Sequence, residues 1–124
     1  MPNTKRNRGK KGMTLVEIML VVAIIGILLA MAVPNLNKAR ENTYRNQCIT
    51  HMRRIAAAKE HWSLETGAAD TDVPTAGQLD PYIKDGTSSL FCPLDANSSF
   101  ASSYNINNIS TNPSCKIDAT HLLP

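Results

Sequence analysis

Hydrophobic residues are distributed very unevenly along this chain of 124 residues. From Ile18 to Val33 every residue is apolar or glycine, and with residues 13–17 the segment runs for 21 residues before Pro34. As a helix rising about 1.5 Å per residue it would be about 31 Å long, close to the thickness of a bilayer's hydrocarbon core. The core helix of a soluble protein seldom runs this far without a polar interruption. The pattern therefore predicts a membrane-spanning helix over residues 13–33.

After Pro34 the pattern stays helical as far as Thr66, and Gly67 is a plausible residue to end the helix. Residues 34–66 are expected to continue the same helix as an amphipathic segment. One face carries apolar residues at spacings near 3.5, which indicates packing against a partner. Its members are Cys48, Met52, Ile55 and Trp62, with Ile49 and Ala56 alongside.

Residues 67–124 have the short-range pattern of a small head. Residues 67–86 are polar and rich in turn signals, and short strands are expected near 90–92, 103–107 and 115–117. We expect a small antiparallel β-rich head packed on the second half of the long helix, which is an α+β fold.

Charge is concentrated at the N-terminus. Residues 1–12 carry five basic side chains and no acidic one, whereas the remaining residues carry eight basic and ten acidic. The net charge of +3 therefore divides into +5 and −2, which disfavours a nucleic-acid-binding domain. We interpret the helix arginines at 40, 45, 53 and 54 as solvated or subunit-pairing charges in preference to a DNA contact. The positive-inside rule keeps the basic end cytoplasmic and sends the C-terminal part across the membrane.

Glu17 is the exception within the apolar segment. A carboxylate at the membrane centre costs about 3 kcal/mol, although less near the interface. Either Glu17 lies near the bilayer edge, or it pairs with a cation buried beside it. A newly made N-terminal amine at residue 13 is the one positive group near that depth. A cleaved secretory signal fits less well, because the apolar stretch exceeds the usual 7–15 residues.

The junction reads KKG and then MTLVEIMLVVAIIGILLAMAVPNLNKAR. This resembles the class III signal of type IV pilins and of the pseudopilins of type II secretion. The resemblance implies cleavage after Gly12, a leader over residues 1–12, and N-methylation of Met13, where phenylalanine is commonest. It also implies assembly roles for Glu17, Gly26 and Pro34, the last being the helix-kinking proline.

The resemblance further implies a pilin-like lollipop and a non-enzymatic structural subunit. Such a subunit crosses the bacterial inner membrane once, with its head in the periplasm or outside. It then joins a helical filament of identical subunits and minor pilins, a type IV pilus or a pseudopilus. The implied partners are prepilin peptidase, an inner-membrane platform protein, an assembly ATPase and the lipid bilayer. The alternative is a signal-anchored periplasmic binding module that does not polymerise.

The residues themselves favour a filament by a separate argument. In a helical assembly the carboxylate of Glu17 could meet the amine of Met13 on a neighbour, which offsets the cost of burying either charge alone. A subunit out of register would leave both charges unpaired. The pair would therefore set the axial stagger of the subunits.

Three cysteines lie in a part of the chain expected outside the cytoplasm, where disulfides form. Cys92 is expected to pair with Cys115, because both fall in predicted strands of the head. Cys48 is left over on the helix, where a lone buried thiol usually acts as a small hydrophobic residue. A Cys-Pro, a tyrosine-containing strand, a second cysteine and a late histidine also recur in small pilin-like proteins.

The sequence offers few residues whose spacing is that of a metal or cofactor site. Cys48 with His51, or His51 with His61, gives no four-ligand set, so both histidines are expected to be solvated. Asp95, Asn97 and Ser99 are spaced like the start of a calcium loop, but Phe100 and Ile106 stand where glycine and glutamate are needed. Major pseudopilins bind calcium in the head, so calcium is retained as a weak alternative to an Asx-rich turn. We expect no other cofactor.

Overall fold

The computed structural model describes residue 12 and residues 14–124. The predicted leader and Met13 therefore lie almost wholly outside the described residues. The chain divides into two compact units, the first ending at Lys38 and the second comprising Ala39–Pro124. One helix, α1 (Leu15–Thr66), runs through both units, and all other described elements belong to the second.

Helix α1 begins with a capping box. The backbone N–H of Glu17 donates to the hydroxyl of Thr14 (3.3 Å), and the backbone N–H of Thr14 donates to the Glu17 carboxylate (3.1 Å). The helix passes through Pro34 and ends at Thr66, followed by Gly67 with φ of 67°. The predicted extent and end of the helix are confirmed over the described residues.

The core of the second unit is built on one face of α1. The predicted stripe is confirmed, since Cys48, Met52, Ile55 and Trp62 are all buried. Ala58 of the same helix and buried side chains from the head complete the core; those of the head are Leu79, Ile83, Leu90, Cys92, Phe100, Tyr104 and Cys115. Ile49 packs against this cluster without being fully buried.

Lys59 lies on the same face and is only 2% exposed, which the stripe did not predict. Its ammonium donates to the carbonyl oxygens of Ile106 (2.9 Å), Asn108 (2.8 Å) and Thr111 (2.6 Å). Three acceptors satisfy all three of its protons, which makes burial of the charge tolerable. Lys59 thereby fixes the loop 106–111 to α1.

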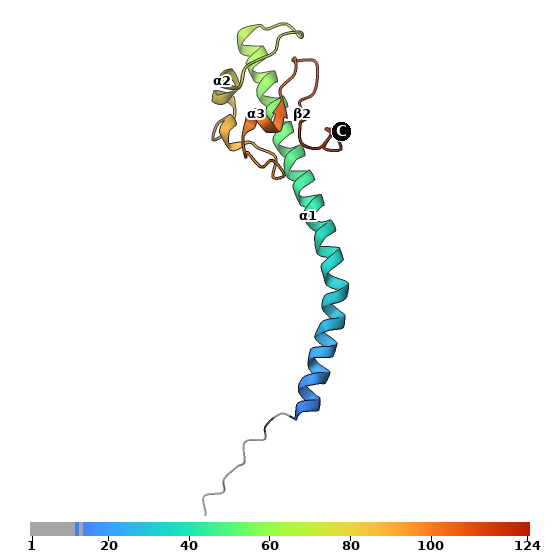
Figure 1. The fold of residues 1–124 in the computed structure, drawn as a ribbon. Helices are drawn as coiled ribbons and strands as arrows, with labels where there is room; N and C mark the ends of the chain where they lie inside the picture. Colours follow the sequence, from blue (N-terminus) through green and yellow to red (C-terminus); the bar gives the residue numbers. More distant parts are fainter. Residues whose placement is uncertain (1–11, 13) are drawn as a thin grey trace, which may run out of the picture. The chain divides into compact units, whose positions relative to one another are not determined.

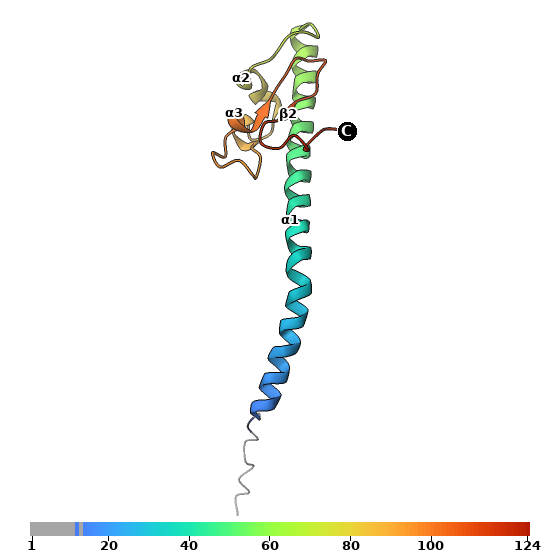
Figure 2. The same cartoon turned by 45° about the vertical axis from the view of Figure 1, so that its right-hand side comes forward.

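Short elements cover this face of α1, as Figures 1 and 2 show for α2, α3 and β2. They are α2 (Ala76–Leu79), η1 (Asp80–Tyr82), η2 (Thr87–Ser89) and α3 (Phe100–Ser103). The segment 67–86, expected as a polar connection, thus contains two of them. A capping box between Thr75 and Gln78 starts α2.

The predicted antiparallel sheet is present but small. Strand β1 (Tyr104–Asn105) pairs with β2 (Ser114–Cys115), and Tyr104 lies opposite Cys115. The strand expected near residues 90–92 is wrong. Leu90 and Cys92 are buried as predicted for a strand, but the backbone N–H of Cys92 donates to the Ser103 hydroxyl (2.9 Å) instead of to another strand. The head therefore depends more on loops and short helices than a β-rich description implies.

Candidate functional site

The first candidate site is the apolar part of α1. Every residue from Thr14 to Thr43 is exposed in the single chain. The helix is long and apolar enough to cross a membrane by length and composition, and none of its most apolar window is buried within the chain. The large exposed side chains include Leu15, Ile18, Leu20, Ile25, Leu28 and Leu36. This surface needs lipid or other protein to cover it.

Glu17 is the one ionisable residue in the first turns of α1. Its carboxylate points back toward the helix N-terminus, because it accepts the N–H of Thr14. Negative charge is favourable there, since the helix dipole and the unpaired N–H groups are positive. The structure thus gives Glu17 a local role in capping, which sequence reasoning missed although the spacing Thr14–Glu17 is that of a capping box.

Gly26 and Pro34 occupy the same helix. A Cβ added at Gly26 would meet no atom within 4 Å in the described part of the chain, so nothing within it requires glycine there. Pro34 lacks the N–H that would bond the carbonyl four residues earlier, yet the helix continues on both sides. The assembly roles of both residues stay predictions.

The second candidate site is a cluster of three cysteines and one histidine. One ligand atom each from Cys48, Cys92, Cys115 and His121 lies within 4.8 Å of all the others, and the four residues are buried. Cys48 comes from α1, Cys92 from the loop after η2, Cys115 from β2 and His121 from the turn before the C-terminus. The structure contains all three cysteines as thiols. The expected Cys92–Cys115 disulfide stays a prediction, and the Sγ of Cys48 also lies within 4.8 Å of both sulfur atoms.

Burial makes the thiols of Cys48 and Cys92 weak acids. Removal from water raises the pKa of Cys48 far above its usual range, while the Tyr104 hydroxyl beside it acts in the opposite direction. Burial likewise raises the pKa of Cys92, against a lowering by the backbone of Leu94. Without a bound cation these two thiols are therefore neutral and poorly nucleophilic.

The two helix histidines differ in their surroundings. His61 is exposed, as expected, whereas His51 is half-buried and its Nδ1 lies 3.1 Å from both the Phe91 carbonyl and the Tyr104 hydroxyl. The expectation of a solvated side chain is thus wrong for His51. Desolvation lowers the pKa of His51, so the neutral ring is favoured.

The weak calcium candidate lies in a closed turn. Asp95 is buried, and its carboxylate accepts hydrogen bonds from the Asn97 backbone (3.0 Å) and from the hydroxyls of Ser103 (2.7 Å) and Ser102. These bonds lower the pKa of Asp95 to about 2. The side chains of Asn97 and Ser99 make no contribution to them. The geometry describes an Asx turn, and calcium binding stays an untested alternative.

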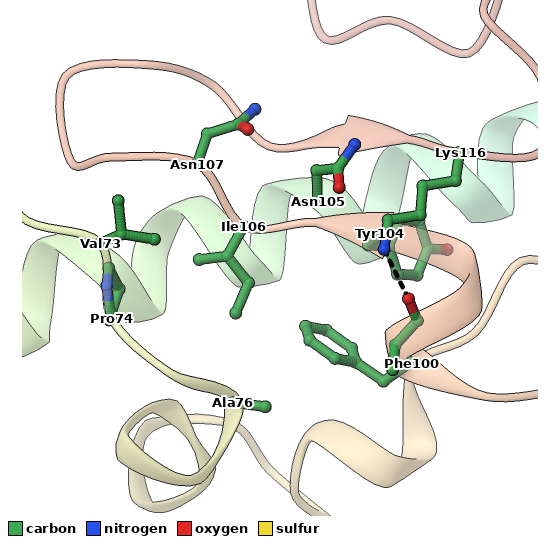
Figure 3. Close-up of a pocket in the computed structure, with 10 residues that line it drawn as sticks. Val73, Pro74, Ala76, Phe100, Tyr104, Asn105, Ile106, Asn107 and Lys116 are labelled. Carbon is green, nitrogen blue, oxygen red and sulfur yellow. Dashed lines mark hydrogen bonds between the residues drawn. The ribbon is translucent and has the colours of Figure 1, made fainter.

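A surface cavity of about 490 Å³ lies between the segment 73–76 and the α3–β1 region (Figure 3). Phe100, Tyr104 and Ile106 form its apolar wall, and the backbone N–H of Tyr104 donates to the carbonyl of Phe100. Lys116, at its rim, donates to the Ala101 carbonyl (2.7 Å). The lining contains no carboxylate or histidine, so these residues offer no acid–base pair for catalysis.

The N-terminal segment matches a known family. The family model described as the prokaryotic N-terminal methylation motif matches residues 7–33. This range includes the predicted cleavage residue Gly12, the predicted N-terminus Met13 and Glu17. The match confirms the resemblance that was inferred from the junction.

Curated relatives match about half of the chain. The chain is 37% identical over 59 residues to the type IV major pilin protein PilA of Myxococcus xanthus, covering 48% of this chain and 27% of that protein. It is 38% identical over 58 residues to a fimbrial protein of Pseudomonas aeruginosa, covering 47% and 38%. It is 30% identical over 66 residues to the type II secretion system core protein G of Klebsiella michiganensis, covering 53% and 46%.

The matched region spans less than half the length of each of these relatives. No solved structure matches the chain. The family model covers residues 7–33 and each relative about half of the chain, so the head must be interpreted from its own residues.

Proposed function

We propose that the protein is a structural subunit of a type IV pilus-like filament or of a type II secretion pseudopilus, because residues 7–33 match the prokaryotic N-terminal methylation motif and about half of the chain is similar to a type IV pilin and to a type II secretion core protein G. Prepilin peptidase cleaves after Gly12 and methylates Met13. The subunit then waits in the inner membrane with its head in the periplasm. A platform protein and an assembly ATPase move it into the filament. The role involves no catalysis.

The observation that carries this proposal is the complete exposure of the apolar part of α1. Burying apolar surface is favourable by about 25 cal/mol per Å², whether the covering phase is lipid or neighbouring helices. Lipid covers the segment before assembly, and equivalent segments of other subunits cover it afterwards. Extraction from the bilayer thus loses little apolar burial, which makes a transfer from membrane to filament feasible.

Glu17 supplies the register of that assembly. In the filament its carboxylate pairs with the Met13 amine of a neighbour, since an unpaired charge among apolar helices would be costly. The capping box supports this function, because the bond from Thr14 directs the Glu17 carboxylate toward the N-terminal end of the helix. That end is where a neighbour's amine would have to approach.

Capping and charge pairing are separable by mutation. Glu17→Gln keeps an oxygen that can accept the Thr14 N–H but removes the negative charge. Thr14→Ala removes half of the capping box but keeps the charge. Glu60→Gln, at an exposed glutamate farther along α1, is the matched control. The three variants are compared in cells by the share of the protein in sheared filaments or cross-linked oligomer ladders.

We expect Glu17→Gln to reach the membrane but to lose more than about 90% of its assembly. A penalty of about 1.4 kcal/mol per contact already lowers the equilibrium constant for adding a subunit tenfold. Thr14→Ala and Glu60→Gln should assemble nearly as the wild type does. Normal assembly by Glu17→Gln would overturn the register role.

The mass of the protein from native membranes tests processing separately: a chain beginning at Met13 with one added methyl group supports the proposal. An uncut chain would favour a signal-anchored binding module.

A further inference from the structure

The cysteine–histidine cluster combines side chains that no single segment could supply. Cys48, Cys92, Cys115 and His121 come from four different segments of the second unit, and their ligand atoms lie within 4.8 Å of one another. In a tetrahedral zinc site with Zn–S bonds of about 2.3 Å, the sulfur atoms are about 3.8 Å apart. Shifts of about 1 Å or less would therefore close the cluster around one ion. We propose that these four residues form a structural zinc site.

His121 provides an independent indication of a missing ligand. The side chain is only 4% exposed, and its Nδ1 is buried without a hydrogen-bond partner in the described part of the chain. A buried polar atom left unpaired costs about 1–3 kcal/mol, so a partner is expected. A metal ion among the three sulfur atoms would supply that partner.

The other ring nitrogen of His121 is already oriented. Its Nε2 lies 3.6 Å from the carboxylate of Asp118, which in turn accepts bonds from the backbone (2.8 Å) and the hydroxyl (2.7 Å) of Thr120. Histidine ligands of metals usually donate their second N–H to a carboxylate in this way, which fixes the tautomer and the ring orientation. Asp118 is thus a positioning residue for the site, with Nδ1 of His121 as the ligand atom.

A disulfide is the competing use of the same sulfur atoms. Three thiols are close together, so any one disulfide would leave the third cysteine outside the bond and the Nδ1 of His121 buried without a partner in the described part of the chain. A zinc ion engages all four groups at once. The metal therefore accounts for the whole cluster, whereas the predicted Cys92–Cys115 bond accounts for half of it.

The donor set identifies the metal and its role. Three thiolates and one imidazole are a ligand set typical of zinc, and hard cations such as calcium prefer oxygen. Four protein ligands leave no open coordination position, so the ion is structural and not catalytic. It would tie α1 to the loop after η2, to β2 and to the C-terminal turn. A head whose strands have two residues each gains much from such a cross-link.

The first test measures metal and thiols on the full chain, purified in detergent without chelator or added metal. We expect one zinc per chain by elemental analysis, and three free thiols once the protein is denatured with chelator and no reductant. Replacing zinc by Co²⁺ should give the absorption of a tetrahedral thiolate site. A protein with no zinc and one free thiol would overturn the proposal in favour of a disulfide. Three thiols without zinc, even after the reduced protein is given Zn²⁺, would also overturn it.

The second test locates the ion. His121→Asn should weaken zinc binding by at least about 100-fold, since loss of an outer partner alone costs 10–100-fold. His61→Asn, at an exposed histidine of α1, is the matched control and should bind as the wild type does. If Co²⁺ absorption and zinc affinity are unchanged in His121→Asn, the ion is bound elsewhere and the assignment fails. Co²⁺ absorption and zinc affinity report on the bound metal itself, so they do not merely measure the stability of the variant.

Discussion

The ligand atoms of Cys48 and His121 lie within 4.8 Å of each other. Cys48 belongs to the long helix α1, whereas His121 belongs to the last turn of the chain. Their proximity means that the C-terminal segment closes over the same face of α1 that the stripe buries. Together with the two other cysteines, this pair connects segments of the head that are far apart in the chain.

Removal of metal should destabilise the protein, whereas reduction alone should not. Binding of a ligand to the folded state alone contributes about 4 kcal/mol when its free concentration is about 1000 times its Kd. We expect a chelator to lower the urea midpoint of the full chain in detergent, as followed by the fluorescence of Trp62, and added Zn²⁺ to restore it. A reductant without chelator should leave the midpoint unchanged. The reverse pattern would indicate a disulfide.

Asp118 should affect metal affinity through His121. In Asp118→Ala the imidazole loses the carboxylate that faces its Nε2, so zinc affinity should fall by about 10–100-fold. Thr120→Ala is the control, because it removes a hydroxyl bond of the same turn but keeps the carboxylate. Competition with a chromophoric chelator measures both. Equal losses in the two variants would mean that the turn matters and the carboxylate does not.

Lys59 should contribute strongly to the stability of the head. Lys59→Met leaves the carbonyl oxygens of Ile106, Asn108 and Thr111 without their shared donor, and we expect a loss of about 3 kcal/mol in the free energy of unfolding. Lys84→Met, at an exposed lysine, should change it by less than about 0.5 kcal/mol. Urea unfolding of the two variants provides the comparison. Equal midpoints would show that water satisfies the three carbonyls.

Asp80 should make stability depend on pH in the acid range. Its carboxylate accepts bonds from the hydroxyl (2.5 Å) and the backbone N–H (2.7 Å) of Thr87, and these bonds lower the pKa of Asp80. Because the pKa is lower in the folded state, the stabilisation is fully present above the ordinary aspartate pKa of about 3.9. It is lost as the pH falls through the lowered pKa.

Asp80→Asn should accordingly have a lower urea midpoint than the wild type at pH 7, and the difference should shrink as the solution is acidified toward pH 2. Asp70→Asn, at an exposed aspartate, serves as the control. A constant difference at all pH values would mean that the charge of Asp80 does not contribute.

Much of the chain could be predicted because the relevant signals are local. An uninterrupted apolar run from Ile18 to Val33 determines the exposed helical segment, since length and hydropathy need no tertiary contact. The spacing of Cys48, Met52, Ile55 and Trp62 likewise determines which face of α1 is buried. Gly67 determines where the helix ends, because it adopts a positive φ at little cost.

The tertiary structure decided how the head is held together. The apolar residues near Leu90 and Cys92 are buried without forming a strand, because the Ser103 hydroxyl accepts the N–H that a ladder would need. Lys59 is buried because three carbonyls of a distant loop converge on it. The cysteines and His121 become one cluster only when four segments meet. Such contacts join residues far apart in the chain, so no local spacing or periodicity predicts them. The helix and its N-terminal junction, in contrast, depend on residues that are close together in the sequence.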